Sequence, residues 1–186
     1  MSNILLKFRQ KIGDWLNEYN PKLCDSQTFR GPLLEKKKVL ILSAITSSED
    51  KETISAIKKE VREMCPRAEI HTIGYCADKG ESLISDKYEE YFTEKDLSFF
   101  FKIKSRRLIE ALGAGYDIMI VMNRCESVSL NYIAKFALAS LRVGCAGTIL
   151  DKDGILNFVI EHNGEGPQIS KKMRSCLEMV FENQIV

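Results

Sequence analysis

Hydrophobic residues recur at steps of three and four along the first 20 residues, which is the period of an amphipathic helix. We therefore predict a helix over residues 3–20. It ends at Asn20-Pro21, because the residue before a proline avoids the α region. Residues 21–37 contain three helix breakers and are typical of a connector. The apolar face of the helix comprises Ile4, Leu5, Phe8, Ile12, Trp15, Leu16 and Tyr19.

From residue 38 onward, short apolar runs alternate with helical patterns. The unbroken run at residues 39–42 is typical of a strand buried on both faces of a parallel sheet. The alternation predicts a doubly wound, mostly parallel, Rossmann-like α/β sheet, formed by a domain of residues 38–186 that follows a leader of residues 1–37. Further strands are predicted at residues 70–75, 90–92, 116–122 and 142–144, and helices at residues 47–65, 105–112, 130–141 and 170–182.

One segment departs from this alternation. The apolar runs at residues 148–150 and 155–160 flank the sequence Asp151-Lys152-Asp153-Gly154. That composition is typical of a tight turn between two strands. We therefore expect an antiparallel hairpin at one edge of the sheet.

The composition is that of an ordinary globular protein. Hydrophobic residues make up 45% of the 186 residues and charged residues 28%, which argues against disordered, collagen-like and membrane classes. No run approaches the roughly 18 apolar residues of a membrane span, and no secretory segment is evident near the start. The six cysteines are scattered without a CxxC pair, so we expect free, mostly buried thiols and a cytoplasmic location.

Charge is balanced over the whole chain but not along it. With 27 basic and 26 acidic residues the net charge is +1, so we expect no nucleic-acid partner. The segment through Lys38 carries eight basic and four acidic residues. A basic amphipathic helix can lie on a membrane surface, but its basic face is sparse for that. Packing on its own domain, or contact with a second copy or a protein partner, is favoured instead.

The switch point of the predicted sheet is the candidate binding site, because ligands of such sheets lie beyond the carboxyl ends of the strands where the strand order reverses. The loop after the first strand, residues 43–48, has no glycine and cannot form a glycine-rich phosphate cradle. The hydroxyls of Ser47 and Ser48 at a helix start can still hold a polar group. Across the switch point lie Asn123 and Arg124. We predict that these four residues bind a small polar ligand.

A purely structural interpretation competes with that site. Ser47 and Asp50 have the spacing of a capping box, and the negative charge of Glu49 and Asp50 competes with any bound anion. Helix capping is therefore the stronger explanation of the two serines.

Candidates for catalysis, metal binding and cofactor binding are weak. His71 and His162 lie far apart in different contexts, which gives no basis for a metal site or a catalytic triad. Cys76 and Cys125 fall near strand ends but have no histidine close in sequence. We therefore expect no catalytic residue, no metal and no cofactor.

Several segments together resemble a family of small α/β proteins of unknown function from Bacteroidota. The resemblance covers roughly residues 1–160 and implies the fold and a bacterial cytoplasmic protein, without any catalytic residue. The segments that carry it are Ile73-Gly74-Tyr75, Glu94 to Phe100, Tyr116-Asp117-Ile118, Tyr132-Ile133-Ala134 and Leu141-Arg142-Val143-Gly144.

A more distant similarity is to the N-terminal half of heptosyltransferase-type glycosyltransferases. It rests on the segments Asp117-Ile118 and Arg142-Val143-Gly144, which resemble two recurring strand motifs of those enzymes. The resemblance implies a second, nucleotide-sugar domain and a glycine-containing loop, and this sequence has neither. We therefore expect a non-catalytic ligand-binding or protein-interaction module. The alternative is an enzyme acting on a nucleotide or a sugar.

Overall fold

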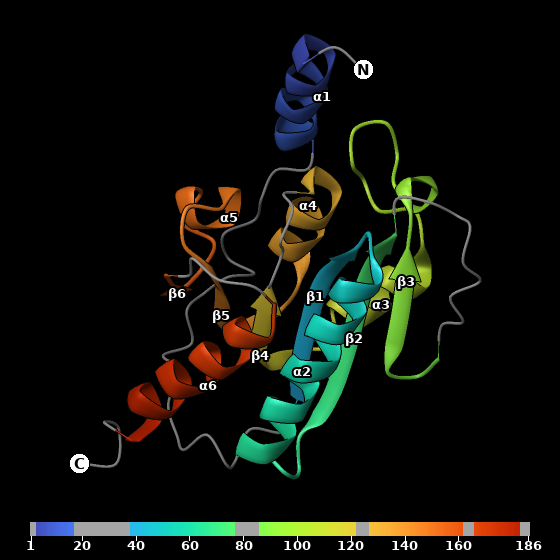
Figure 1. Cartoon of the computed structure of the whole chain (residues 1–186). Coiled ribbons are helices and arrows are strands. Elements are labelled where there is room, and N and C mark those ends of the chain that lie inside the picture. The colour runs from blue at the N-terminus through green and yellow to red at the C-terminus, as the bar shows by residue number, and fades with distance from the viewer. Residues whose placement is uncertain (1–2, 17–37, 77–85, 122–126, 162–165, 183–186) are drawn as a thin grey trace.

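A computed structural model describes residues 3–16, 38–76, 86–121, 127–161 and 166–182 (Figure 1). Its centre is a six-stranded sheet with the order β3-β2-β1-β4-β5-β6, in which every neighbouring pair is parallel. This is the strand order of a doubly wound Rossmann-like sheet, so that part of the prediction is confirmed. The strands are β1 (Lys38–Ile45), β2 (Glu69–Cys76), β3 (Glu89–Phe92), β4 (Tyr116–Val121), β5 (Ala139–Cys145) and β6 (Phe158–Ile160).

Helices cover both faces of the sheet. On one face, α2 and α6 lie side by side (Figure 1). The alternation along β1 explains the two layers. Val39 and Ile41 pack with α2 and α6, while Leu40 and Leu42 pack with α3, α4 and α5. The helices are α1 (Asn3–Leu16), α2 (Ser48–Met64), α3 (Arg106–Leu112), α4 (Val128–Phe136), α5 (Ile149–Lys152) and α6 (Gly166–Glu182), with a short 3₁₀ helix η3 (Glu94–Asp96) after β3.

The predicted antiparallel hairpin is wrong. Residues 149–152 form the single turn α5, and β6 runs parallel to β5. Thr148 starts the helical turn, because its hydroxyl accepts a hydrogen bond from the Asp151 amide. Leu150 is then buried against the sheet, and Gly154 at φ +67° redirects the chain toward β6. The segment Asp151 to Gly154 therefore ends α5, within the crossover connection from β5 to β6.

The helix predicted over residues 130–141 is observed as α4 at Val128–Phe136, and β5 begins soon after it, at Ala139. Helix α4 ends at Phe136, and Ala137 is already extended. The guanidinium of the buried Arg142 donates a hydrogen bond of 2.8 Å to the Ala137 carbonyl, which takes that carbonyl out of any helix. Tertiary contact therefore overrides the helix propensity of Ala137 and Ala139.

Helix α1 packs against its own domain, next to α4. The Tyr132 hydroxyl of α4 donates to the Gln10 carbonyl of α1, and Leu6 packs against the core under α3 and α4. The predicted apolar face is not buried as a whole, since Leu5 and Phe8 are 43% and 57% exposed. Contact of this helix with a second copy, a protein partner or a membrane surface stays a prediction, as does the division into residues 1–37 and 38–186. Among the described residues, no helix has the length and apolar character needed to span a lipid bilayer.

Candidate functional site

A cavity of about 520 Å³ lies at the switch point, beyond the carboxyl ends of the central strands. Strands β1 and β4 pair with each other, and the chain leaves them toward opposite faces of the sheet. We call this cavity the crevice. Its lining residues come from the ends of β1 and β2, the segments after β3, the start of α4, and α1, namely Ala44, Thr46, Tyr75, Glu94, Phe101, Ser127, Val128, Ser129, Leu6 and Arg9.

Glu94 is the polar centre of the crevice. Its Oε1 accepts hydrogen bonds from the hydroxyls of Tyr75, at 3.0 Å, and Ser129, while its Oε2 lies 3.1 Å from the Arg9 guanidinium. Burial raises the pKa of Glu94, but the hydrogen bonds from Ser129, Arg9 and Tyr75 outweigh burial and hold the pKa below its usual range. Glu94 is therefore ionised at neutral pH and joins β2, α1 and α4 through one carboxylate.

Local sequence chemistry fixes the position of Glu94. It is the first residue of η3, directly after Thr93, whose hydroxyl accepts from the Lys95 amide. The Asp96 carboxylate in turn accepts from the Thr93 amide, which completes a capping box. The turn that follows the edge strand β3 is thereby rigid, and it holds Glu94 at the carboxyl edge.

Arg9 closes the crevice from α1. It is only 7% exposed, its Nε donates to the Phe99 carbonyl, and its guanidinium carbon lies 4.0 Å from the centre of the Phe101 ring. Phe101 itself has a φ of +61°, in a region that residues other than glycine seldom adopt. Its ring is 1% exposed and stacks on Tyr132 of α4, with 4.7 Å between ring centres. The strained backbone at Phe101 is therefore held by packing on both sides of one ring.

Neither Ser47 nor Ser48 lines this crevice, although Thr46, the residue before them, does. Ser47 is the N-cap of α2 and Ser48 is its first residue, and both are exposed. One oxygen of Asp50 accepts hydrogen bonds from the amides and hydroxyls of Thr46 and Ser47, at 2.8 to 3.2 Å. The predicted capping box is therefore confirmed. Asn123 and Arg124 lie outside the described residues, and ligand binding by the four residues stays a prediction.

Asp50 provides a direct test of this helix start. Burial raises the pKa of Asp50, but the hydrogen bonds from Thr46 and Ser47 outweigh it and hold the pKa below its usual range. We expect Asp50→Asn to lower the free energy of unfolding by about 1 to 2 kcal/mol at pH 7. Because the folded-state pKa is depressed, this contribution is present above about pH 4 and falls as the pH drops further. Denaturant unfolding of the wild-type protein and of Asp50→Asn, at pH 7 and again below about pH 4, measures this difference in the free energy of unfolding.

The matched control for Asp50 is Glu49→Gln, which removes a carboxylate from the same helical turn at an exposed position. It is expected to change the free energy of unfolding by less than about 0.5 kcal/mol. Equal losses for the two variants would show that the helix macrodipole, and not the cluster of hydrogen bonds on Asp50, accounts for the effect.

The strand motifs that suggested a glycosyltransferase have structural roles. The Asp117 carboxylate accepts from the Lys38 amide at 3.0 Å, at the amino end of the sheet and away from the crevice. Gly144 of β5 leaves room for Leu156, because a Cβ on it would lie 2.6 Å from a Leu156 methyl carbon. Arg142 is 3% exposed inside the protein. None of the three lines the crevice.

None of the described residues that line the crevice was predicted from the sequence as a ligand residue, and its ion pair of Arg9 and Glu94 was missed as well. In the sequence, Arg9 is one of several basic residues of the leader, and Glu94 lies in a segment that carries the family resemblance. A weak signal existed for Arg9, because it lies four residues after Leu5 and three before Ile12, at the border of the apolar face. Within the described part of the chain, no group of three or more histidine, cysteine or acidic side chains is placed to hold a metal ion.

A family model described as a family of unknown function (DUF6913) matches residues 15–172. The chain belongs to this family. The DUF6913 match begins inside α1 and ends inside α6, so it includes the whole sheet and every crevice residue except Leu6 and Arg9. It confirms the resemblance to a family of unknown function. No curated protein and no solved structure matches the chain. The link to Bacteroidota and the similarity to heptosyltransferase-type enzymes therefore stay predictions.

Proposed function

We propose that this protein is a non-catalytic binding module that holds a small uncharged polar molecule in the crevice. The observation that carries the proposal is the cavity of about 520 Å³ at the switch point of a doubly wound sheet. Ligands of such sheets bind at this position, and small-molecule pockets have volumes of about 300 to 1,000 Å³. We place the protein in the bacterial cytoplasm, and the scattered cysteines without a CxxC pair support a reducing compartment.

The lining supports a ligand that is both polar and partly apolar. Hydroxyl groups come from separate segments of the chain, with Thr46 after β1, Tyr75 near the end of β2, and Ser127 and Ser129 at the start of α4. Leu6, Val128 and Phe101 supply apolar surface between them. A molecule with several hydroxyl groups on a compact ring, such as a sugar or a nucleoside, matches this lining.

Charge argues against an anionic ligand in the crevice. The Glu94 carboxylate is balanced by Arg9, and the start of α2 is already occupied by the Asp50 carboxylate. A second negative group beside Asp50 would be repelled, because it would compete for the same backbone amides. An uncharged ligand avoids this cost.

The ionisation states of the crevice support binding without catalysis. Glu94 is ionised with a depressed pKa, whereas burial and the neighbouring Glu94 charge raise the pKa of Tyr75 to about 12. Neither group exchanges protons readily near neutral pH, as a general acid or base must. An enzyme acting on a nucleotide or sugar, related to a glycosyltransferase half, remains the alternative. In that case Ser129 and Tyr75, both hydrogen-bonded to Glu94, are the reacting hydroxyls to replace first.

Thr46→Trp tests the proposal by filling the crevice. Thr46 is exposed and lines the cavity, and Asp50 keeps its hydrogen bonds from Ser47 when the Thr46 hydroxyl is lost. We expect the wild-type protein to bind at least one of two neutral probes, a free hexose and a nucleoside, in ligand-observed NMR. The variant is expected to bind that probe at least about tenfold more weakly.

The control is Glu52→Trp, which places the same side chain at an exposed position of α2 outside the crevice. It is expected to leave the affinity unchanged. Failure of the wild-type protein to bind either probe, or equal weakening by both tryptophan variants, contradicts the proposal.

A further inference from the structure

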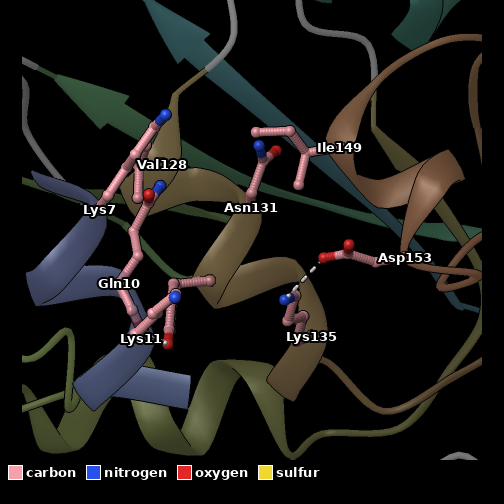
Figure 2. A pocket seen from close by; sticks show the side chains of 9 residues that line it. Lys7, Gln10, Lys11, Val128, Asn131, Lys135, Ile149 and Asp153 are labelled. Carbon is pink, nitrogen blue, oxygen red and sulfur yellow. Dashed lines mark hydrogen bonds and ion pairs between the residues drawn. The ribbon is translucent and has the colours of Figure 1, made fainter. Parts of the chain in front are cut away.

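A second cavity, of about 310 Å³, lies on the other side of α1, where this helix meets α4 and α5 (Figure 2). It is separate from the crevice, and Val128 is the one described residue that lines both. Its polar lining consists of Lys7, Gln10 and Lys11 from α1, Asn131 and Lys135 from α4, and Asp153 after α5.

Asn131 is the central observation. Figure 2 shows its side chain projecting from α4 into the space between Gln10 of α1 and Ile149 of α5. The residue is only 5% exposed, and its amide Nδ2 is buried with no hydrogen-bond partner among the described residues. A buried amide without a partner is costly, so almost all such groups in proteins are satisfied. A polar ligand in this cavity supplies the missing acceptor once the Asn131 side chain turns toward it.

The charges around Asn131 define the sign of that ligand. Lys7 and Lys11 are both exposed at the cavity. Asp153 is the one carboxylate among the described residues that line it. Asp153 is 2.9 Å from the Lys135 ammonium and is balanced by it. The cavity therefore carries an excess of two positive charges. The amino end of α4 adds to this field, because Val128, its first residue, also lines the cavity.

We propose that this cavity binds a small molecule that carries a phosphate group. Lysine ammonium groups bind phosphate as point charges, and an asparagine amide donates to its oxygens. The phosphate lies between Lys7 and Lys11 and accepts the hydrogen bond from Asn131. A volume of about 310 Å³ leaves room for a short polar body beside the phosphate. This site has the opposite charge preference to the crevice.

Charge reversal on α1 tests the proposal. Inorganic phosphate and glycerol 3-phosphate are titrated into the protein at constant ionic strength, and binding is followed by ³¹P NMR. We expect saturable binding of at least one probe, and we expect Lys7→Glu with Lys11→Glu to weaken it at least about tenfold. The matched control is Lys171→Glu with Lys172→Glu, two exposed positions on α6, which changes the net charge equally. It is expected to weaken binding by less than about twofold.

Asn131→Leu separates the specific site from a general attraction to basic surface. Leucine has a similar size but no amide, so the variant is expected to lose phosphate binding at least about tenfold while the ligand-free protein becomes no less stable. Three results would overturn the proposal: no saturable binding of either probe, equal weakening by the two double lysine variants, or wild-type affinity in Asn131→Leu. Thr46→Trp blocks only the crevice, so failure of one proposal is distinguishable from failure of the other.

Discussion

Replacing Phe101 by alanine is expected to lower the free energy of unfolding by about 3 to 5 kcal/mol. The ring is 1% exposed and lies between the Tyr132 ring at 4.7 Å and the Arg9 guanidinium at 4.0 Å, so alanine leaves a cavity where α1, α4 and the crevice meet. Urea unfolding at neutral pH measures the loss. The control is Phe99→Ala, because Phe99 is 53% exposed and is expected to cost less than about 1 kcal/mol.

The backbone at Phe101 allows a sharper test. Alanine normally stabilises a protein relative to glycine, because glycine loses more conformational freedom on folding. At φ +61° the order reverses, since glycine adopts that region without strain. We expect Phe101→Gly to be more stable than Phe101→Ala by about 0.5 to 1 kcal/mol. If Phe101→Ala were the more stable of the two variants, the prediction that a positive φ at this position favours glycine would be contradicted.

Replacing Arg9 by alanine is expected to lower the free energy of unfolding by about 2 to 4 kcal/mol. The variant loses the hydrogen bond to the Phe99 carbonyl, the packing on Phe101 and the ion pair with Glu94. The expected loss is smaller than the loss of about 3 to 5 kcal/mol for breaking a fully buried ion pair, because the Glu94 side chain is 47% exposed and water compensates part of its charge. Urea unfolding measures this loss as well.

Two further variants assign the Arg9 effect to its causes. Arg9→Ala combined with Glu94→Gln completes a double-mutant cycle, and a positive coupling energy of about 1 kcal/mol is expected between the two residues. Lys7→Ala is the control, because it removes a basic but exposed side chain two residues away on the same helix. A loss of stability in Lys7→Ala equal to that in Arg9→Ala would contradict the assigned role of Arg9.

The sheet was predictable because its signals are local. The unbroken run at residues 39–42 marked β1, and the capping-box spacing of Ser47 with Asp50 marked the start of α2. Such patterns depend only on neighbouring residues. The prediction of a hairpin around Asp153 failed because the turn composition of this segment is compatible with either a hairpin or a helix end. The choice depends on burial of Leu150 against the sheet, which is a tertiary contact.

The sequence pointed to the switch point as the place to look for a candidate site, but it did not reveal which residues line the crevice there. Strand order directs attention to the switch point of the sheet, and the sequence analysis selected the segment after β1 on that ground. The pair of Arg9 and Glu94 joins residues 85 positions apart, and no periodicity in the sequence connects them. Asn131 is equally inconspicuous, since an asparagine within a helical pattern gives no sign that its amide is buried without a partner.

Helix α1 is synthesised before every segment that it contacts. Its hydrogen-bonding partners come late, since Glu94 lies 85 residues after Arg9, and Tyr132 lies 122 residues after Gln10. An isolated helix of 14 residues is only marginally stable in water, so α1 gains lasting order when those partners are present. Long-range contacts of this kind form slowly compared with local ones. The α1 side of the crevice is therefore completed only after ribosomal synthesis has passed α4.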